Sequence, residues 1–328
     1  MPDRKKPVSP VSRRTARITE QRNPRSAGLD TKSTLEILRV INREDRVVAH
    51  AVSKVIPQIA RAVDLAVNAL ARGGRLVYLG AGTSGRLGVL DAAECIPTFG
   101  TEQVIAVMAG APNAMFRPSE VSEDDPKLGE RDLRKIKFSR KDLLVGISAS
   151  GRTPYVLGGL RYARRLGAVT ALLTANPEAE GRRLACVLIA PVVGPEVIAG
   201  STRMKAGTAQ KLVLNMLSTA TMVRLGRVFS NLMIGVQLTN SKLRKRALGI
   251  LMDSTGASAG RARNALEDAG NSLPVALLML AQGISSSQAI GLLEAGSKPT
   301  DVLRRAVCAD PSDQAQAEAR KAERLLRH

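Results

Sequence analysis

Hydrophobic and polar positions divide the chain into segments of two kinds. Short apolar runs bounded by turn residues predict buried strands, and apolar residues that recur every three or four positions predict helices. Strands are expected at residues 75–79, 104–108, 142–147, 168–173 and 185–190, with helices at residues 84–95 and 154–166 among them. Short strands that alternate with helical segments predict an α/β fold, a doubly wound parallel sheet with helices on both faces.

The second half of the chain has a helical pattern after Gly200. Long helices are expected at residues 205–223 and 229–252, and short helices separated by Gly or Pro follow up to residue 307. Such short helices predict a small C-terminal helical bundle. The expected organisation is a disordered basic tail (1–18), an α/β domain (19–254), a small helical domain (255–308) and a charged helical tail (309–328).

A glycine-rich loop, Gly80-Ala81-Gly82-Thr83-Ser84-Gly85, follows the first expected strand. Glycines let the backbone approach a ligand closely, and the helix that starts here offers unpaired N–H groups and the positive end of its dipole. Thr83 and Ser84 add hydroxyl donors, so the loop predicts an anion site. Glu94 lies on the same helix and is a candidate acid near that site.

Two further segments, residues 146–154 and 194–211, have a similar composition and also precede helices. Their candidate ligand-binding side chains are Ser148, Ser150, Arg152, Thr153, Ser201 and Lys205. Two Ser/Thr-Gly-Arg loops at the ends of two strands can bracket one phosphate. The alternative is that these hydroxyls only cap helices and that the charges lie on an ordinary surface.

The first loop also fits G-x-G-x-x-G, the dinucleotide-binding fingerprint. That fingerprint requires an acidic residue about 20 positions further on, at the end of the second strand. Glu102 has roughly this spacing but comes before the second strand, so the sequence disfavours a dinucleotide. An acidic run at residues 120–125 is, on its residues alone, more typical of a solvated face than of a catalytic site.

The net charge of +20, from 49 Lys+Arg and 29 Asp+Glu, suggests nucleic acid as one candidate partner. Arginine is spread along the whole chain, however, and aromatic residues make up only 2%, which leaves few side chains for base stacking. We therefore expect no nucleic-acid partner.

The cysteines, the histidines and the lengths of the apolar runs limit the compartment and the chemistry that the sequence allows. The three cysteines form no C-x-x-C, and their odd number suits a reducing compartment. No apolar run reaches the roughly 18 residues of a membrane span, so we expect a cytoplasmic protein with no membrane partner. His50 and His328 are the two histidines, which leaves acid–base chemistry to Glu, Asp, Lys or Tyr.

Three motifs together resemble those of the N-acetylmuramic acid 6-phosphate etherase family, which has the sugar isomerase (SIS) fold. They are residues 79–88 with Leu90-Asp91-Ala92-Ala93-Glu94-Cys95, then Ala149-Ser150-Gly151-Arg152-Thr153-Pro154-Tyr155-Val156, and the long run from Gly200-Ser201-Thr202-Arg203-Met204-Lys205 to residue 219. The resemblance covers residues 19–307. It implies an SIS-type sugar-phosphate-binding catalytic domain at residues 19–254.

The resemblance implies that the D-lactyl ether of N-acetylmuramic acid 6-phosphate is cleaved to N-acetylglucosamine 6-phosphate and D-lactate. The reaction is an elimination followed by water addition, which makes the enzyme a carbon–oxygen lyase without metal or nucleotide cofactors. The resemblance also implies a homodimer that serves N-acetylmuramate catabolism in peptidoglycan recycling.

The family's catalytic acid matches Glu94, and its second active-site glutamate matches Glu123 in the acidic run. The resemblance thus implies that Glu94 protonates the leaving lactate and later activates water, while Glu123 takes the C2 proton. Two glutamates can share this work if one is kept protonated by burial or by its neighbour. The alternatives are a non-enzymatic sugar-phosphate-binding SIS regulator, an aldose–ketose isomerase and a nucleic-acid-binding SIS regulator.

Overall fold

The computed structural model describes residues 18–117, 120–238, 240–295 and 299–307, so the two expected tails lie almost wholly outside it. The chain divides into two compact units. The first contains Met1–Asp91 and Ile105–Leu217, and the second contains Ala92–Val104 and Ser218–His328. Each unit is described by itself below.

A parallel five-stranded sheet lies in the first unit, with the strand order β2-β1-β3-β4-β5. Its strands are β1 (Leu76–Gly80), β2 (Val104–Met108), β3 (Leu143–Ile147), β4 (Val169–Leu173) and β5 (Val187–Ile189). β1 and β3 are neighbours although β2 separates them in the sequence. Their carboxyl ends therefore form the switch point at which open α/β sheets bind ligands. The predicted parallel α/β fold is confirmed.

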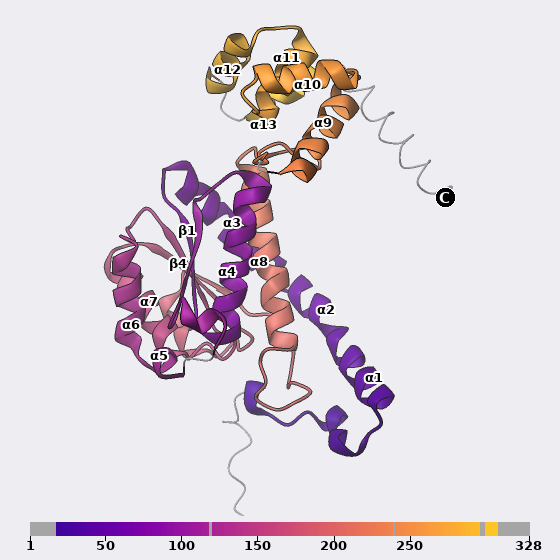
Figure 1. Cartoon of the computed structure of the whole chain (residues 1–328). Coiled ribbons are helices and arrows are strands. Elements are labelled where there is room, and N and C mark those ends of the chain that lie inside the picture. Colours follow the sequence, from indigo (N-terminus) through magenta and orange to yellow (C-terminus); the bar gives the residue numbers. More distant parts are fainter. Residues whose placement is uncertain (1–17, 118–119, 239, 296–298, 308–328) are drawn as a thin grey trace, which may run out of the picture. The chain divides into compact units, whose positions relative to one another are not determined.

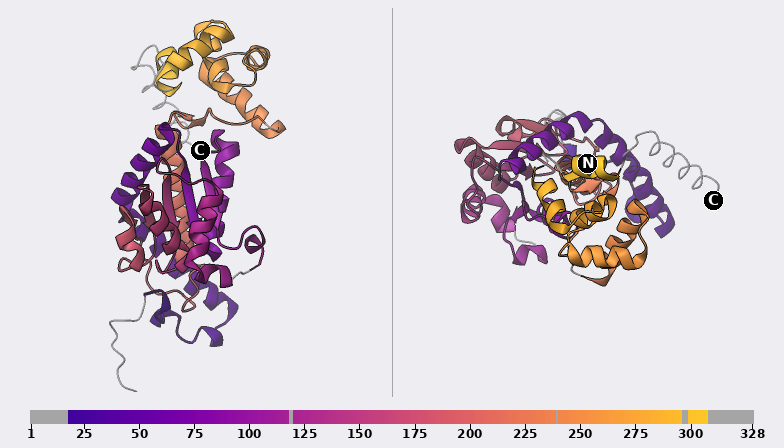
Figure 2. Two further views of the ribbon diagram at one scale, coloured as in Figure 1. Left: turned by 90° about the vertical axis from the view of Figure 1, so that its left-hand side faces the viewer. Right: turned by 90° about the horizontal axis from the view of Figure 1, so that it is seen from above.

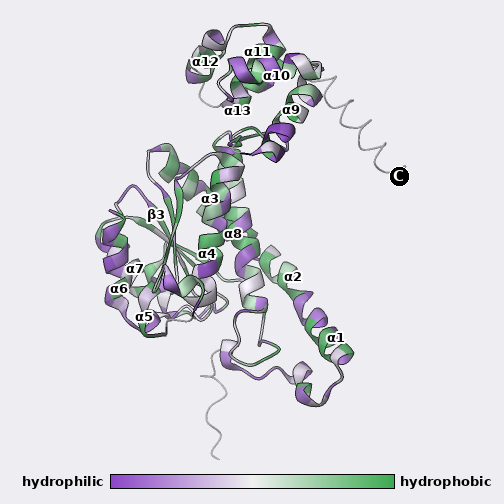
Figure 3. Cartoon of the chain, viewed as in Figure 1, coloured by the Kyte–Doolittle hydropathy of each residue, from purple (hydrophilic) through white to green (hydrophobic). Residues whose placement is uncertain are grey.

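Helices cover both faces of the sheet (Figure 1). α7 (Pro154–Arg165) packs against β1, β3 and β4, and α6 (Pro126–Lys135) packs on α7. α3 (Ile56–Ala71) lies on the other face, against β1, β3 and β5. The strands are mainly hydrophobic, whereas α6 and α1 carry residues of both kinds (Figure 3). This pattern agrees with strands buried between two helical layers.

Glycines set how closely α6 and α7 pack. A Cβ atom at Gly158 would lie 1.9 Å from the carbonyl oxygen of Pro126, and one at Gly129 would lie 2.1 Å from that of Tyr155. A Cβ at Gly159 would lie 2.1 Å from Cδ2 of Leu79. Because interiors are close-packed, no larger side chain fits at these positions without moving α6, α7 or β1 apart.

An N-terminal arm precedes the sheet. It consists of the short helices η1 (Ile18–Glu20), η2 (Pro24–Ser26) and η3 (Leu29–Thr31), followed by α1 (Thr34–Asp45) and α2 (Val47–Ser53). Ser33 and Glu36 form a capping box at the start of α1, each side chain bonded to the other's backbone N–H. α1 lies apart from the sheet (Figure 1), and its Leu35 and Leu38 are 56% and 57% exposed.

The remaining elements connect and complete the two units. They are α4 (Gly82–Phe99), η4 (Asn113–Met115), α5 (Glu120–Asp124), η5 (Glu180–Leu184), α8 (Lys205–Arg224), β6 (Val228–Phe229), β7 (Leu232–Met233), α9 (Ser241–Thr255), α10 (Ala259–Asp268), α11 (Leu273–Gln282), α12 (Ser286–Ala295) and α13 (Pro299–Val307). α8 confirms the helix expected at residues 205–223.

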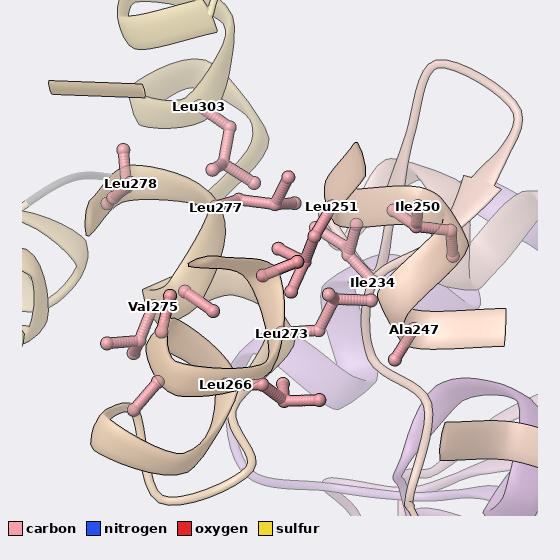
Figure 4. Close-up of a cluster of buried hydrophobic side chains, with 14 of the residues drawn as sticks. Ile234, Ala247, Ile250, Leu251, Leu266, Leu273, Val275, Leu277, Leu278 and Leu303 are labelled. Carbon is pink, nitrogen blue, oxygen red and sulfur yellow. The ribbon is translucent and has the colours of Figure 1, made fainter. Parts of the chain in front are cut away.

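Helices α9 to α13 form a bundle, which both views of Figure 2 show as one group. Leu251, Leu273, Leu277 and Leu303 point into its common core (Figure 4), and each is at most 1% exposed. The expected helical C-terminal region is thereby confirmed. Among the described residues no single helix is long and apolar enough to cross a bilayer; α11 and α12 meet that criterion only as a pair bent by 110°.

The prediction of one helix over residues 229–252 is wrong in its first half. β6 and β7 form a two-stranded hairpin there, with Ser230 at a φ of 51° in its turn, and α9 begins only after Asn240. Phe229 and Ile234 are apolar because they fill the core of the bundle, and not because they belong to a helix. An apolar run alone does not distinguish these two origins.

Candidate functional site

The two glycine loops lie side by side at the carboxyl ends of β1 and β3, where Gly80 is paired in register with Ile147. Gly82 and Gly151 have φ values of 52° and 68°, in the left-handed region that favours glycine. A Cβ at Gly151 would also lie only 2.2 Å from Cβ of Ala179. These two loops therefore need glycine for their shape as well as for access to a ligand.

The hydroxyls predicted in the second loop come together. Ser148 Oγ lies 2.8 Å from Thr153 Oγ1 and 3.5 Å from Ser150 Oγ. Thr153 is the N-cap residue of α7, yet its side chain makes no capping hydrogen bond to that helix. Helix capping, the alternative explanation for a threonine here, does not account for its orientation.

Glu123 faces both loops. Its Oε1 accepts a hydrogen bond from Thr153 Oγ1 at 3.4 Å, and its Oε2 would lie 3.8 Å from a Cβ at Gly82. Its neighbour Val121 is 87% exposed, whereas Glu123 is half-buried. α5 thus turns one carboxylate of the acidic run toward the loops and does not present a uniformly solvated face.

Ser84 contacts a residue that sequence reasoning missed. Its hydroxyl donates a hydrogen bond of 3.0 Å to Oε1 of Gln210 on α8, and both side chains are buried. Gln210 lies in the run that carried the family resemblance, where it is a polar residue among the buried positions Ala206, Ala209 and Val213. The sequence signal that could have identified Gln210 was a single amide side chain on the apolar face of a predicted helix.

The side chain of Lys205 points toward Glu44 of α1. Its Nζ lies 2.6 Å from Oε2 of Glu44, and the lysine side chain is 0% exposed. Asn23 and Arg25 of the N-terminal arm also donate to the Glu44 carboxylate. Burial acts to raise the pKa of Glu44, but these hydrogen bonds outweigh it and lower that pKa to about 2.

The start of α8 holds a carboxylate of the chain itself. Glu196 accepts hydrogen bonds from the backbone N–H groups of Lys205 at 3.1 Å and Ala206 at 2.9 Å. Burial raises the pKa of the Glu196 carboxyl. These N–H groups would otherwise attract an anionic ligand, so the third predicted segment is occupied internally at this point.

The other predicted residues lie on the same elements. Gly82 and Thr83 begin α4, and Glu94 is exposed on that helix about three turns later. Arg152 is half-buried in the second loop, and Ser201 is half-buried in the segment before α8. No three His, Cys, Asp or Glu side chains of the described residues are grouped so that they could hold a metal ion.

Two curated relatives of this chain have the same name. This chain is 53% identical over 281 residues to an N-acetylmuramic acid 6-phosphate etherase of Edwardsiella ictaluri (strain 93-146). The alignment covers 85% of this chain and 94% of that protein. The chain is 54% identical over 276 residues to the N-acetylmuramic acid 6-phosphate etherase of Yersinia pestis (strain Pestoides F), covering 84% and 94%. The chain belongs to the N-acetylmuramic acid 6-phosphate etherase family.

Other comparisons match a smaller part of this etherase-family chain. Residues 58–164 match the family described as the glucokinase regulatory protein N-terminal SIS domain. A phosphoheptose isomerase from Francisella tularensis is 16% identical, with a TM-score of 0.47, over 58% of this chain and 100% of that one. The Vibrio vulnificus NanR protein complexed with ManNAc-6P is 17% identical, with a TM-score of 0.43, over 61% and 67%.

Proposed function

We propose that this protein cleaves the D-lactyl ether of N-acetylmuramic acid 6-phosphate, releasing D-lactate and N-acetylglucosamine 6-phosphate. The observation that carries the proposal is the 53% identity over 281 residues to a curated protein named for this etherase activity. The names of these relatives favour an enzyme over a non-enzymatic SIS regulator. The proposed reaction class is that of a carbon–oxygen lyase.

The phosphate is assigned to the two loops at the ends of β1 and β3. Gly82 and Thr83 offer the start of α4, which favours negative charge, and the second loop adds hydroxyls and a cation. The proposed substrate-binding residues are Gly82, Thr83, Ser84, Ser148, Ser150, Arg152, Thr153 and Ser201. The contacts of Lys205 with Glu44 favour a supporting role, in which it holds the start of α8.

The proposed chemistry uses two glutamates. In the open-chain sugar the C1 aldehyde acidifies the C2 hydrogen, and Glu123 removes it as a proton. The C3–oxygen bond then breaks, and Glu94 gives a proton to the departing lactate oxygen. Water adds at C3 of the unsaturated aldehyde, with Glu94 as the base, and protonation at C2 completes the product. The 3.4 Å contact between Thr153 and Glu123 supports this by linking a proposed catalytic carboxylate to the proposed phosphate loop.

We further propose that the protein acts as a homodimer in the cytoplasm, in N-acetylmuramate catabolism and peptidoglycan recycling. Leu35 and Leu38 support the homodimer, because α1 lies apart from the sheet and both leucines are more than half exposed. Apolar residues grouped on one exposed helix are typical of a protein–protein contact.

The direct test is to incubate the purified protein with N-acetylmuramic acid 6-phosphate and to measure D-lactate with a D-lactate dehydrogenase. We expect D-lactate and N-acetylglucosamine 6-phosphate in equal amounts, and incorporation of solvent deuterium at C2. Release of no lactate by folded protein, with an aldose–ketose conversion of a sugar phosphate instead, would contradict the proposal.

A further inference from the structure

A buried glutamine amide lies beside the first turn of α4. Gln210 is 2% exposed, and its Oε1 accepts the hydrogen bond from the Ser84 hydroxyl. Within the described part of the chain, Nε2 of the same amide is buried and has no hydrogen-bond partner. Leaving a buried donor unpaired costs folding free energy, so this amide group calls for an explanation.

The donors and acceptors of Ser84 and Gln210 determine which hydrogen bonds the two residues can make to a ligand. Ser84 has one hydroxyl hydrogen, which it gives to Gln210 in this orientation, so it can donate that hydrogen to an anion only when the amide is turned round. The amide has two N–H donors, and both are unused. With the amide turned round, Nε2 would donate once to Ser84 and would still keep one unused N–H. In either orientation the pair retains a donor for an outside acceptor.

The unused Nε2 donor of Gln210 lies close to the start of α4. A Cβ at Gly207, one turn before Gln210, would lie 3.5 Å from Cγ2 of Thr83, so α8 approaches α4 at its first turn. α4 has 18 residues, and the start of such a helix carries unpaired N–H groups and a positive dipole end. Both features favour an acceptor that carries negative charge.

We propose that Gln210 is a substrate-binding residue, whose Nε2 donates a hydrogen bond to an anionic oxygen of the bound phosphosugar while its Oε1 fixes the Ser84 hydroxyl. This inference rests on the proposed function. N-acetylmuramic acid 6-phosphate carries two anionic groups, the phosphate and the lactyl carboxylate, and either can supply the acceptor.

The test uses Gln210→Met, which keeps an unbranched, helix-forming side chain but removes the amide, together with the double variant S84A/Q210M. We expect the KM for N-acetylmuramic acid 6-phosphate to rise by ~10-fold or more in both. The melting temperature of the double variant should stay the same or rise, because neither partner is then left unpaired. A glutamine with a purely structural role would show the opposite, a lower melting temperature with an unchanged KM.

Gln288 provides the matched control. Its Oε1 accepts hydrogen bonds from the backbone N–H and the hydroxyl of Ser285 at the start of α12. Gln288→Met should lower the melting temperature slightly, as the loss of a cap does, and leave the KM unchanged. If Gln210→Met fails to fold, Gln210→Glu retains the volume and the acceptor for Ser84 but lacks the amide donors, and the same rise in KM is expected.

Binding measurements distinguish the phosphate from the lactyl carboxylate as the acceptor. By calorimetry, weaker binding of N-acetylglucosamine 6-phosphate to Gln210→Met would assign the phosphate, and weaker binding of unphosphorylated N-acetylmuramic acid alone would assign the carboxylate. A wild-type protein that neither binds nor cleaves N-acetylmuramic acid 6-phosphate would contradict the proposed function itself. An active wild type whose Gln210 variants keep its KM and its affinities would overturn this inference alone.

Discussion

Nζ of Lys205 lies 2.6 Å from Oε2 of Glu44, and the two side chains are 0% and 1% exposed. The pair links the start of α8 to α1 across 161 residues of sequence. Asn23 donates to the same carboxylate at 2.7 Å, and Arg25 adds a second cation. This network ties the N-terminal arm to the start of α8.

Removing one partner of the buried pair should destabilise the first unit strongly. In Glu44→Leu the Lys205 ammonium would be left buried and unpaired, and we expect the free energy of unfolding to fall by about 3–5 kcal/mol. The double variant Glu44→Leu/Lys205→Met should recover most of this loss, because neither charge of the pair is then left buried without its partner. Urea unfolding of the single and double variants measures both effects. Equal losses in the single and double variants would argue against an energetic coupling of the pair.

The same carboxylate should make stability depend on pH in the acid range. The pKa of Glu44 is about 2 in the folded protein, below its ordinary value of 4.5. A lowered folded-state pKa gives stability that is complete above about pH 4.5 and is lost as the pH falls toward 2. Unfolding free energies at pH 6, 4 and 3 should therefore fall more steeply for wild type than for Glu44→Gln. Parallel curves would mean that Glu44 titrates normally.

Glu94→Gln tests the proposed proton donor. The amide keeps the shape but cannot exchange a proton, so we expect kcat for lactate release to fall by ~10²–10⁴ with little change in KM or melting temperature. Glu102→Gln serves as a control, since Glu102 is an exposed glutamate outside the proposed site. Near-wild-type turnover by Glu94→Gln would remove Glu94 from the mechanism.

Leu35→Ser/Leu38→Ser tests the role of α1 in the proposed homodimer. Both leucines are more than half exposed within one chain, so replacing them should cost little in folding but weaken a contact with a second copy. Light scattering should show a shift from dimer to monomer at micromolar concentration. Leu292→Ser, at a leucine of α12 that is 43% exposed, should leave the mass unchanged. A double variant that stays dimeric would place the interface elsewhere.

Two glycine-to-alanine changes should have opposite effects on stability. At Gly158 a Cβ would lie 1.9 Å from the carbonyl oxygen of Pro126, so Gly158→Ala should force α6 and α7 apart and cost about 1–3 kcal/mol or more. At Gly249, within α9, a Cβ would meet nothing within 4 Å, and Gly249→Ala should stabilise by about 0.5–1 kcal/mol. Thermal unfolding of the two variants would show the contrast, and equal shifts would contradict the close packing of α6 on α7.

The sequence by itself determined the sheet and the two glycine loops at the carboxyl ends of β1 and β3. Buried strands, glycine turns and helix starts are encoded over a few neighbouring residues, so residues 76–85 and 143–154 predicted strand, loop and helix directly. Ser148 and Thr153 were predicted as ligand-binding residues for the same reason. The hairpin at β6 and β7 was missed because its apolar residues serve the bundle core, which local periodicity does not report.

The tertiary structure decided which of the predicted polar residues already have partners within the protein. Ser201 and Lys205 share the composition of a phosphate-binding segment, but Glu44 pairs with the lysine and Glu196 occupies the backbone at the start of α8. Gln210 became a candidate only through Ser84, 126 residues away. Sequence composition fixes the hydrogen-bonding capacity of a side chain, whereas burial and distant partners determine how much of that capacity is left for a substrate.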